Sequence, residues 1–265
     1  MPSTIVNGVD LYYECHGKGP PLMLIAGLAS DSQSWQPIVQ ALSRHCLLIL
    51  PDNRGSGRTK PQEIDTSIRQ IADDCMALLD QLELPSATLL GHSMGGFVAL
   101  DCALRYPDRV ANLILAGTSA VNSDRNNALF RDWVSYLQSG MDAEHWFRNV
   151  FYWIFSKHFF ENRETFNDAL RFAVEYPYPQ SDVAFEKQVN AIGEFNCRDK
   201  LPDINARTLL ISGKEDLLFP PEECIKVLQA IPSTSVCLIE NAAHSIHMEN
   251  PTAFTDCVLH FLRNA

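Results

Sequence analysis

The stretch ATLLGHSMGG, residues 87–96, decides how this chain folds. Its first four residues form a short apolar run, typical of a strand buried on both faces, and the residues from Gly95 to Tyr106 favour a helix. The G-x-S-x-G pattern between them requires this strand–turn–helix setting. The serine oxygen is exposed only on a turn so sharp that side chains at positions 91 and 95 would clash, and both positions are glycine. We therefore predict that Ser93 is a nucleophile; a serine in an ordinary structural turn is the alternative.

Apolar runs and helical patterns alternate on both sides of this stretch. Strands are predicted at Thr4–Val6, Val9–Tyr13, Leu22–Ile25, Cys46–Leu50, Val110–Ala116, Thr208–Ile211 and Ser235–Ile239. Helices are predicted at Trp35–Arg44, Ser67–Leu84, Pro221–Ala230 and Pro251–Leu262. Because strands that alternate with helices are joined by crossovers, we predict an α/β fold with a mostly parallel central sheet flanked by helices.

Residues 121–195 interrupt this alternation. They contain no convincing strand but many aromatic residues, among them Trp133, Trp146 and Phe151. We predict that residues 1–120 and 196–265 form the α/β core and that residues 121–195 form a helical insertion. So many large rings favour a pocket for an apolar group, although an ordinary helical core explains part of them.

A serine hydroxyl is a poor nucleophile until a base removes its proton, so a histidine must reach Ser93. His244 directly follows the last predicted strand, and catalytic groups gather at the carboxyl edge of open α/β sheets. His247 is the rival candidate, with a surface position as its ordinary explanation. His92 adjoins the serine, but its side chain is expected to point away from that of Ser93. We predict that His244 is the general base.

The histidine in turn needs an acid that fixes its tautomer and stabilises the imidazolium. Asp216 follows the strand predicted at 208–211, and it completes the chain order serine, aspartate, histidine that accompanies a nucleophile of this kind. Glu215, its neighbour, is the alternative, and a turn or capping role is the ordinary explanation for either. We predict that Asp216 orients His244.

An oxyanion that forms during acyl transfer needs two fixed N–H donors. Met94 begins the helix after the turn, so its amide lies at the positive end of that helix. The second donor is expected from the loop after Leu22–Ile25, where the amide of Leu28 is our candidate. Both assignments rest on position, because backbone donors leave no side-chain signature.

The composition excludes several classes of partner. The formal net charge is −11, whereas nucleic acid and anionic membranes call for clustered Lys and Arg. The N-terminal residues lack the basic and apolar parts of a signal peptide, and no apolar run is long enough to cross a bilayer. The eight cysteines are scattered, without a CxxC pair, so we expect reduced cysteines, a cytoplasmic protein and no metal site.

The chain resembles the α/β-hydrolase superfamily over nearly its whole length. The motifs that carry the resemblance, in the family's order, are IAGL (25–28), DNRGSGR (52–58), LGHSMGG (90–96), RYPDRV (105–110), GKED (213–216) and AH (243–244). Among its members, the chain looks most similar to small carboxylesterases and 3-oxoadipate enol-lactonases. The resemblance implies a serine hydrolase that cleaves an ester or lactone bond of a small, largely apolar substrate through an acyl-enzyme. It also implies that no cofactor is needed and that the helical insertion roofs the active site.

One feature departs from the family pattern. The family usually has His-Gly where this chain has Ala26 and Gly27, so a side chain that supports the oxyanion loop is missing. A structural role is expected for Arg54.

The alternatives that stay open for the function are carbon–carbon bond hydrolysis or perhydrolysis on the same scaffold, and a non-catalytic ligand-binding protein. Whether the protein forms a homo-oligomer is also open. Relatives with an aspartate nucleophile, the haloalkane dehalogenases and epoxide hydrolases, are disfavoured by Ser93.

Overall fold

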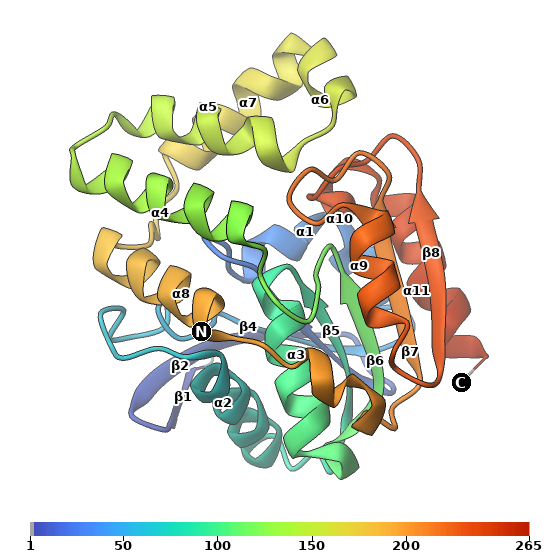
Figure 1. Ribbon diagram of the computed structural model, residues 1–265. Coiled ribbons are helices and arrows are strands. Elements are labelled where there is room, and N and C mark those ends of the chain that lie inside the picture. Colours follow the sequence, from blue (N-terminus) through green and yellow to red (C-terminus); the bar gives the residue numbers. More distant parts are fainter. Residues whose placement is uncertain (1–2, 265) are drawn as a thin grey trace.

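The computed structural model describes residues 3–264. Its eight strands form one sheet in the order β1-β2-β4-β3-β5-β6-β7-β8 (Figure 1). The strands are β1 (Ser3–Val6), β2 (Val9–His16), β3 (Pro21–Ile25), β4 (Leu47–Pro51), β5 (Ala87–His92), β6 (Val110–Ala116), β7 (Thr208–Gly213) and β8 (Thr234–Ile239). The pairs β1–β2 and β2–β4 are antiparallel, and all other neighbouring pairs are parallel. The predicted α/β fold with a mostly parallel sheet is confirmed.

Helices cover both faces of this sheet (Figure 1). They are α1 (Gln36–Leu42), α2 (Ile68–Gln81), α3 (Met94–Arg105), α9 (Pro221–Leu228), α10 (Ile246–Glu249) and α11 (Pro251–Arg263), with short 3₁₀ turns η1 (Ser32–Trp35), η2 (Pro107–Arg109) and η3 (Arg198–Asp203). α2 and α3 pack in one apolar cluster with Met23 and Leu89, whereas α1 and α11 pack in a second cluster with Leu24 and Leu90. Neighbouring residues of a strand point to opposite faces, so β3 and β5 are buried on both sides.

The strand before the G-x-S-x-G serine is longer than the sequence suggests, and the helix after it is displaced by one residue. β5 continues to His92 instead of ending at Leu90, because its pairing with β6 extends that far. α3 begins at Met94 rather than Gly95. A single residue, Ser93, therefore separates a fully buried strand from the helix that follows it.

Residues 124–194, which we call the helical segment, contain five helices. They are α4 (Asp124–Gln138), α5 (Ala143–Ile154), α6 (Lys157–Glu161), α7 (Arg163–Val174) and α8 (Asp182–Glu194). In Figure 1, α5, α6 and α7 lie at the top of the view, on the side where the loops follow the parallel strands, and α4 lies below α5. Val121 and Asn196 form an isolated antiparallel bridge where the chain leaves and rejoins the α/β part. Rings of this segment pack on one another; Phe155 and Phe159, for example, stack with centroids 3.9 Å apart.

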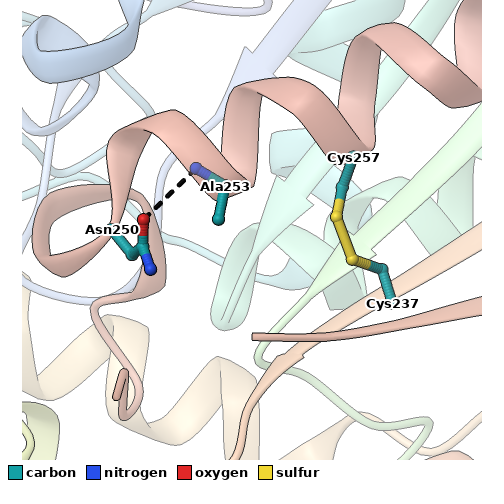
Figure 2. Close-up of a disulfide and its surroundings, with 4 residues drawn as sticks. All are labelled: Cys237, Asn250, Ala253 and Cys257. Atoms are coloured by element: carbon teal, nitrogen blue, oxygen red, sulfur yellow. Dashed lines mark hydrogen bonds between the residues drawn. A yellow bond between two sulfur atoms is a disulfide. The ribbon is translucent and has the colours of Figure 1, made fainter. Parts of the chain in front are cut away.

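Two cysteines form a disulfide, between Cys237 of β8 and Cys257 of α11, with Cα atoms 6.6 Å apart (Figure 2). The side chain of Asn250 accepts a hydrogen bond from the amide of Ala253 and so begins α11 in the same view. The expectation that every cysteine is reduced is wrong for this pair, because the packing of α11 on β8 brings the two residues together. A cytoplasmic location, which rests partly on that expectation, stays a prediction. None of the helices within residues 3–264 is long and apolar enough to span a bilayer.

Candidate active site

Ser93 occupies a strained backbone position between β5 and α3. Its φ of 54° and ψ of −120° lie in a region that residues with a side chain rarely adopt. The surrounding structure holds this conformation: the amide of Ser93 donates to the carbonyl of Ala116 at 3.0 Å, and the hydroxyl of Thr118 donates to the carbonyl of Ser93 at 2.8 Å. A non-glycine residue kept in such a conformation is a feature of functional sites.

The glycines of the pattern have the spatial role that the sequence analysis assigns to them. A Cβ atom on Gly91 would lie 2.1 Å from the carbonyl oxygen of Gly95, and one on Gly95 would lie 2.0 Å from the carbonyl oxygen of Ile25. Both contacts are with backbone atoms that cannot move aside. The strand, the turn and the first turn of α3 can approach each other only because these two positions lack side chains.

His244 and Asp216 form a buried pair. The Nδ1 atom of His244 lies 3.0 Å from Oδ2 of Asp216. The other carboxylate oxygen, Oδ1, accepts the amides of Leu218 at 2.9 Å and Phe219 at 2.8 Å. A carboxylate can only accept, so the Nδ1 atom of His244 carries the proton, which leaves Nε2 with a free lone pair. This is the tautomer that a general base requires.

The end of β6 brings this pair and Ser93 to one place. Ala116, the last residue of β6, accepts the amide of Ser93. At the next residue, Gly117, a Cβ atom would lie 3.2 Å from Nδ1 of His244 and 3.4 Å from Oδ2 of Asp216. The three predicted side chains therefore lie at the carboxyl edge of the sheet, after β5, β7 and β8.

The two rival residues have other surroundings. The Glu215 carboxylate accepts the amide of Lys157 at 3.3 Å and does not bind His244. His247 lies on α10, is buried, and packs against Trp35 with ring centroids 4.5 Å apart and planes inclined by 34°. Neither ring nitrogen of His247 has a hydrogen-bond partner among the described residues, although the backbone of Ser34 faces the ring and partly offsets the effect of burial on its pKa. Burial lowers the pKa of His247 to about 3.

The loop after β3 lies against the serine. A Cβ atom on Gly27 would lie 3.0 Å from Cβ of Ser93. The amide of Leu28 has no acceptor among residues 3–264. Met94 is the first residue of α3, and amides at that position have no partner within a helix. Both amides are therefore available to an incoming oxygen.

Asn53 supports this loop, a role that the sequence analysis did not assign. Its side-chain Nδ2 donates to the carbonyl of Ala26 at 2.9 Å. The side-chain amide of Asn53, which follows β4, thus holds the loop after β3. It does so although the histidine that family members carry at the position of Ala26 is missing. The sequence feature that could have predicted this role is a polar residue just after β4, the strand that pairs with β3. Arg54 has a structural environment: its Nε lies 2.8 Å from the carboxylate of Asp74, and both are buried.

Glu249 connects the helical segment to the loop that carries His244. One carboxylate oxygen accepts the amide of Ser156 at 2.8 Å, and the other accepts the amide of Ala243 at 2.7 Å. Burial raises the pKa of Glu249. The amide of Ser245 also donates to the carbonyl of Ile154 at 2.9 Å. The residue after His244 is therefore bonded to the end of α5, and the residue before it is linked through Glu249 to Ser156, just beyond α5.

Comparisons with known proteins agree with this architecture. The family model described as alpha/beta hydrolase fold matches residues 20–251. A relative named "Putative carbamate hydrolase RutD", from Agrobacterium fabrum (strain C58), is 28% identical over 95% of this chain and 98% of its own length. The crystal structure of the enol-lactonase from Burkholderia xenovorans LB400 has a TM-score of 0.89 and 26% identity, covering 99% of this chain and 100% of the other. A thermophilic esterase from Thermogutta terrifontis has a TM-score of 0.87 and 27% identity, covering 99% of this chain and 96% of the other.

Fold and site together define a protein with a sharp serine turn at the carboxyl edge of a mostly parallel sheet. The chain belongs to the α/β-hydrolase family, and it is a hydrolase. Among the described residues, no group of three His, Cys, Asp or Glu side chains is arranged to hold a metal ion.

Proposed function

We propose that this protein hydrolyses an ester or lactone bond of a small, largely apolar molecule through an acyl-enzyme on Ser93. The observation that carries the proposal is the buried hydrogen bond from His244 to Asp216, at the same sheet edge as the strained Ser93. Because two backbone amides hold one oxygen of Asp216, its other oxygen is fixed toward His244. A neutral imidazole in this tautomer can accept a proton only at Nε2.

The reaction has two acyl-transfer steps. As the Oγ atom of Ser93 bonds to the substrate carbonyl carbon, its proton passes to Nε2 of His244. The carbon–oxygen bond to the leaving group then breaks, and His244 returns the proton to the leaving oxygen. A water molecule attacks the acyl-enzyme in the same manner, which releases the acid and restores Ser93.

The amides of Leu28 and Met94 stabilise the negative oxygen in both steps. Each such donor contributes about 3 kcal/mol in enzymes where one has been removed. The bond from Asn53 to Ala26 holds the loop that presents Leu28. Two neighbouring amides from different elements favour carbonyl chemistry over a simple binding role.

The helical segment is proposed to cover the site, and its ring-rich interior suits an apolar substrate group. A carbamate is the second candidate substrate class, because the RutD relative carries that name and a carbamate carbonyl can be attacked in the same way. A carbamate carries a nitrogen on its carbonyl carbon, so either the alcohol leaves and Ser93 holds a carbamoyl group, or the amine leaves and Ser93 holds a carbonate group. Water then cleaves either intermediate and restores Ser93.

The test is a panel of chromogenic esters, lactones and carbamates, together with a ring-cleavage diketone. Wild type, Ser93→Ala and His244→Ala are compared with Ser139→Ala, an exposed serine at the end of α4. We expect kcat/KM to fall by about 10⁴-fold or more in the two site variants, with an unchanged fold, and to stay at the wild-type level in the control. A fluorophosphonate should modify Ser93, as located by peptide mass spectrometry. Wild-type turnover in Ser93→Ala would remove the proposal.

A further inference from the structure

His92, the residue before the serine, contacts the backbone of the proposed base. Its side chain is buried, and its Nε2 atom lies 2.8 Å from the carbonyl oxygen of His244. A carbonyl can only accept a hydrogen bond, so Nε2 of His92 carries the proton. The two imidazole rings also pack together, with centroids 4.7 Å apart and planes inclined by 45°.

The opposite edge of the same ring faces the proposed oxyanion loop. A Cβ atom on Gly27 would lie 3.4 Å from Nδ1 of His92 and 3.0 Å from Cβ of Ser93. One side chain thus lies between the loop that presents Leu28 and the loop that presents His244. Its own backbone ends the strand that leads into Ser93.

Several hydrogen bonds hold the backbone of the loop around His244, among them three that reach different parts of the chain. Glu249 accepts the amide of Ala243, Ile154 accepts the amide of Ser245, and His92 donates to the carbonyl of His244. The first comes from α10 and the second from the helical segment. Only the third comes from β5, so it alone ties the base directly to the strand of the nucleophile.

We propose that His92 is a positioning residue that fixes the distance between His244 and Ser93 through its Nε2–H bond to the carbonyl of His244. This inference rests on the proposed function. The bond to Asp216 and the bonds at Ala243 and Ser245 hold His244 relative to the loop after β7, α10 and the helical segment, but none of them ties it to the strand that carries Ser93. In enzymes, a misplacement of about 1 Å costs on the order of 100-fold in rate. The rigid ring of His92, at the end of β5, opposes such a misplacement.

The chemistry of this position suits a neutral ring. Burial, together with the neighbouring His244 and His247, lowers the pKa of His92 well below 6.5. Among residues 3–264, those two histidines are the titratable groups that act on its pKa, and no carboxylate there stabilises a positive charge on it. His92 therefore stays an uncharged donor when His244 takes up the serine proton. A second cation would oppose that step.

The test compares two variants that differ in one property. His92→Phe keeps a planar ring but removes the donor, whereas His92→Gln keeps an N–H donor at about the position of Nε2. We expect kcat to fall by about 10- to 100-fold in His92→Phe, with KM within about 3-fold of wild type. His92→Gln should recover kcat to within about 5-fold of wild type.

His247→Phe is the matched control. His247 is also a buried histidine in contact with His92, with ring centroids 4.8 Å apart, but it has no bond to His244. Its kcat should stay within about 3-fold of wild type. Equal kcat in wild type and His92→Phe would overturn the proposal. So would an equal loss in folded His92→Phe and His92→Gln, because retention of the donor would then have no effect.

A substrate-free measurement separates this inference from the proposed function. Histidine side-chain nitrogen NMR reports which ring nitrogen carries the proton. We expect His92 of the wild-type protein to be neutral and protonated at Nε2 at every pH at which the protein is active. Protonation at Nδ1 instead would overturn the positioning role, even if neither variant folds. A wild-type protein with this Nε2 proton that never reacts with fluorophosphonate would instead reject the acyl-enzyme function.

Discussion

The carboxyl edge of the sheet and the helical segment differ in how deeply their residues are buried and in what holds their backbones. Every residue of β5 and of β7 is buried, and parallel pairing on both sides fixes the backbone from which Ser93 and the loop to Asp216 emerge. In the helical segment, α7 buries only Leu170 and α6 buries none of its residues. Its rings pack mainly on each other.

This difference indicates which part of the molecule can hold side chains in fixed positions. Groups that react must be held to within a fraction of an ångström, and paired strands provide such a frame. The helical segment, with its many half-exposed rings, has less of its surface fixed by burial. Changes at the sheet edge should therefore affect the rate strongly, and changes elsewhere should affect mainly stability.

The largest effect is expected from Asp216→Asn. The amides of Leu218 and Phe219 would keep the carbonyl oxygen of the new side chain, so its NH₂ group would face Nδ1 of His244. That nitrogen would then have to accept, and Nε2 would carry the proton and lose its function as a base. The same change in the Ser-His-Asp template lowers kcat by about 10⁴-fold. Steady-state rates and a thermal unfolding curve would measure the effect.

Glu215→Gln is the matched control for this prediction. The two acids are neighbours, but Glu215 accepts an amide of the helical segment, from Lys157, rather than a proton of His244. We expect its kcat to stay within about 3-fold of wild type. Equal losses in the two variants would contradict the comparison between the sheet edge and the helical segment.

A smaller effect is expected from Cys237→Ser. The disulfide closes a loop with a sequence separation of 20, and this loop contains His244. Loss of the cross-link should lower the free energy of unfolding by about 3 kcal/mol, with a smaller change in kcat because His92 and Glu249 still anchor the loop. Urea unfolding would measure the difference. Cys15→Ser, at an exposed free cysteine, is the control; a disulfide that contributes nothing would make the two variants equally stable.

The sequence was a sufficient guide wherever local rules decide the structure. Apolar runs and the glycines around Ser93 predicted the strands and the sharp turn, since each depends on neighbouring residues. Asp216 and His244 could be selected because both follow predicted strands, and the ends of parallel strands meet at one edge. The bond between their side chains, at 3.0 Å, agrees with that selection.

The remaining contacts could not be predicted because they join distant segments through backbone atoms. The bond from His92 to the carbonyl of His244 spans 152 positions, and that from Asn53 to the carbonyl of Ala26 spans 27. A carbonyl is present at every residue, so it leaves no pattern in the sequence. The pairing of Cys237 with Cys257 likewise depends on how α11 packs on β8, which no cysteine spacing encodes.

The smallest expected effect is a change in how the free energy of unfolding depends on pH. It is tested on His247, in the α/β part, and on His158, in the helical segment. The pKa of His247 falls from 6.5 to about 3 because burial penalises the imidazolium. Below about pH 6.5 the unfolded chain therefore takes up a proton that the folded protein does not. The stabilising contribution of His247 is complete above that pH and declines as the pH falls toward 3. Between pH 7.5 and 5.5 the decline is about 1 kcal/mol.

His247→Phe should remove this part of the decline in unfolding free energy, as measured by urea unfolding at several pH values. His158 of α6 is exposed, and a hydrogen bond with Glu161 raises its pKa, so its contribution has the opposite sign. It is present below pH 6.5 and is lost as the pH rises through the folded-state pKa. Solvent weakens that contribution, so His158→Gln should keep the acid decline of wild type. Identical declines in wild type and His247→Phe would mean that the folded protein admits a proton to this ring, and the sheet side of the molecule would then be less rigid than its burial indicates.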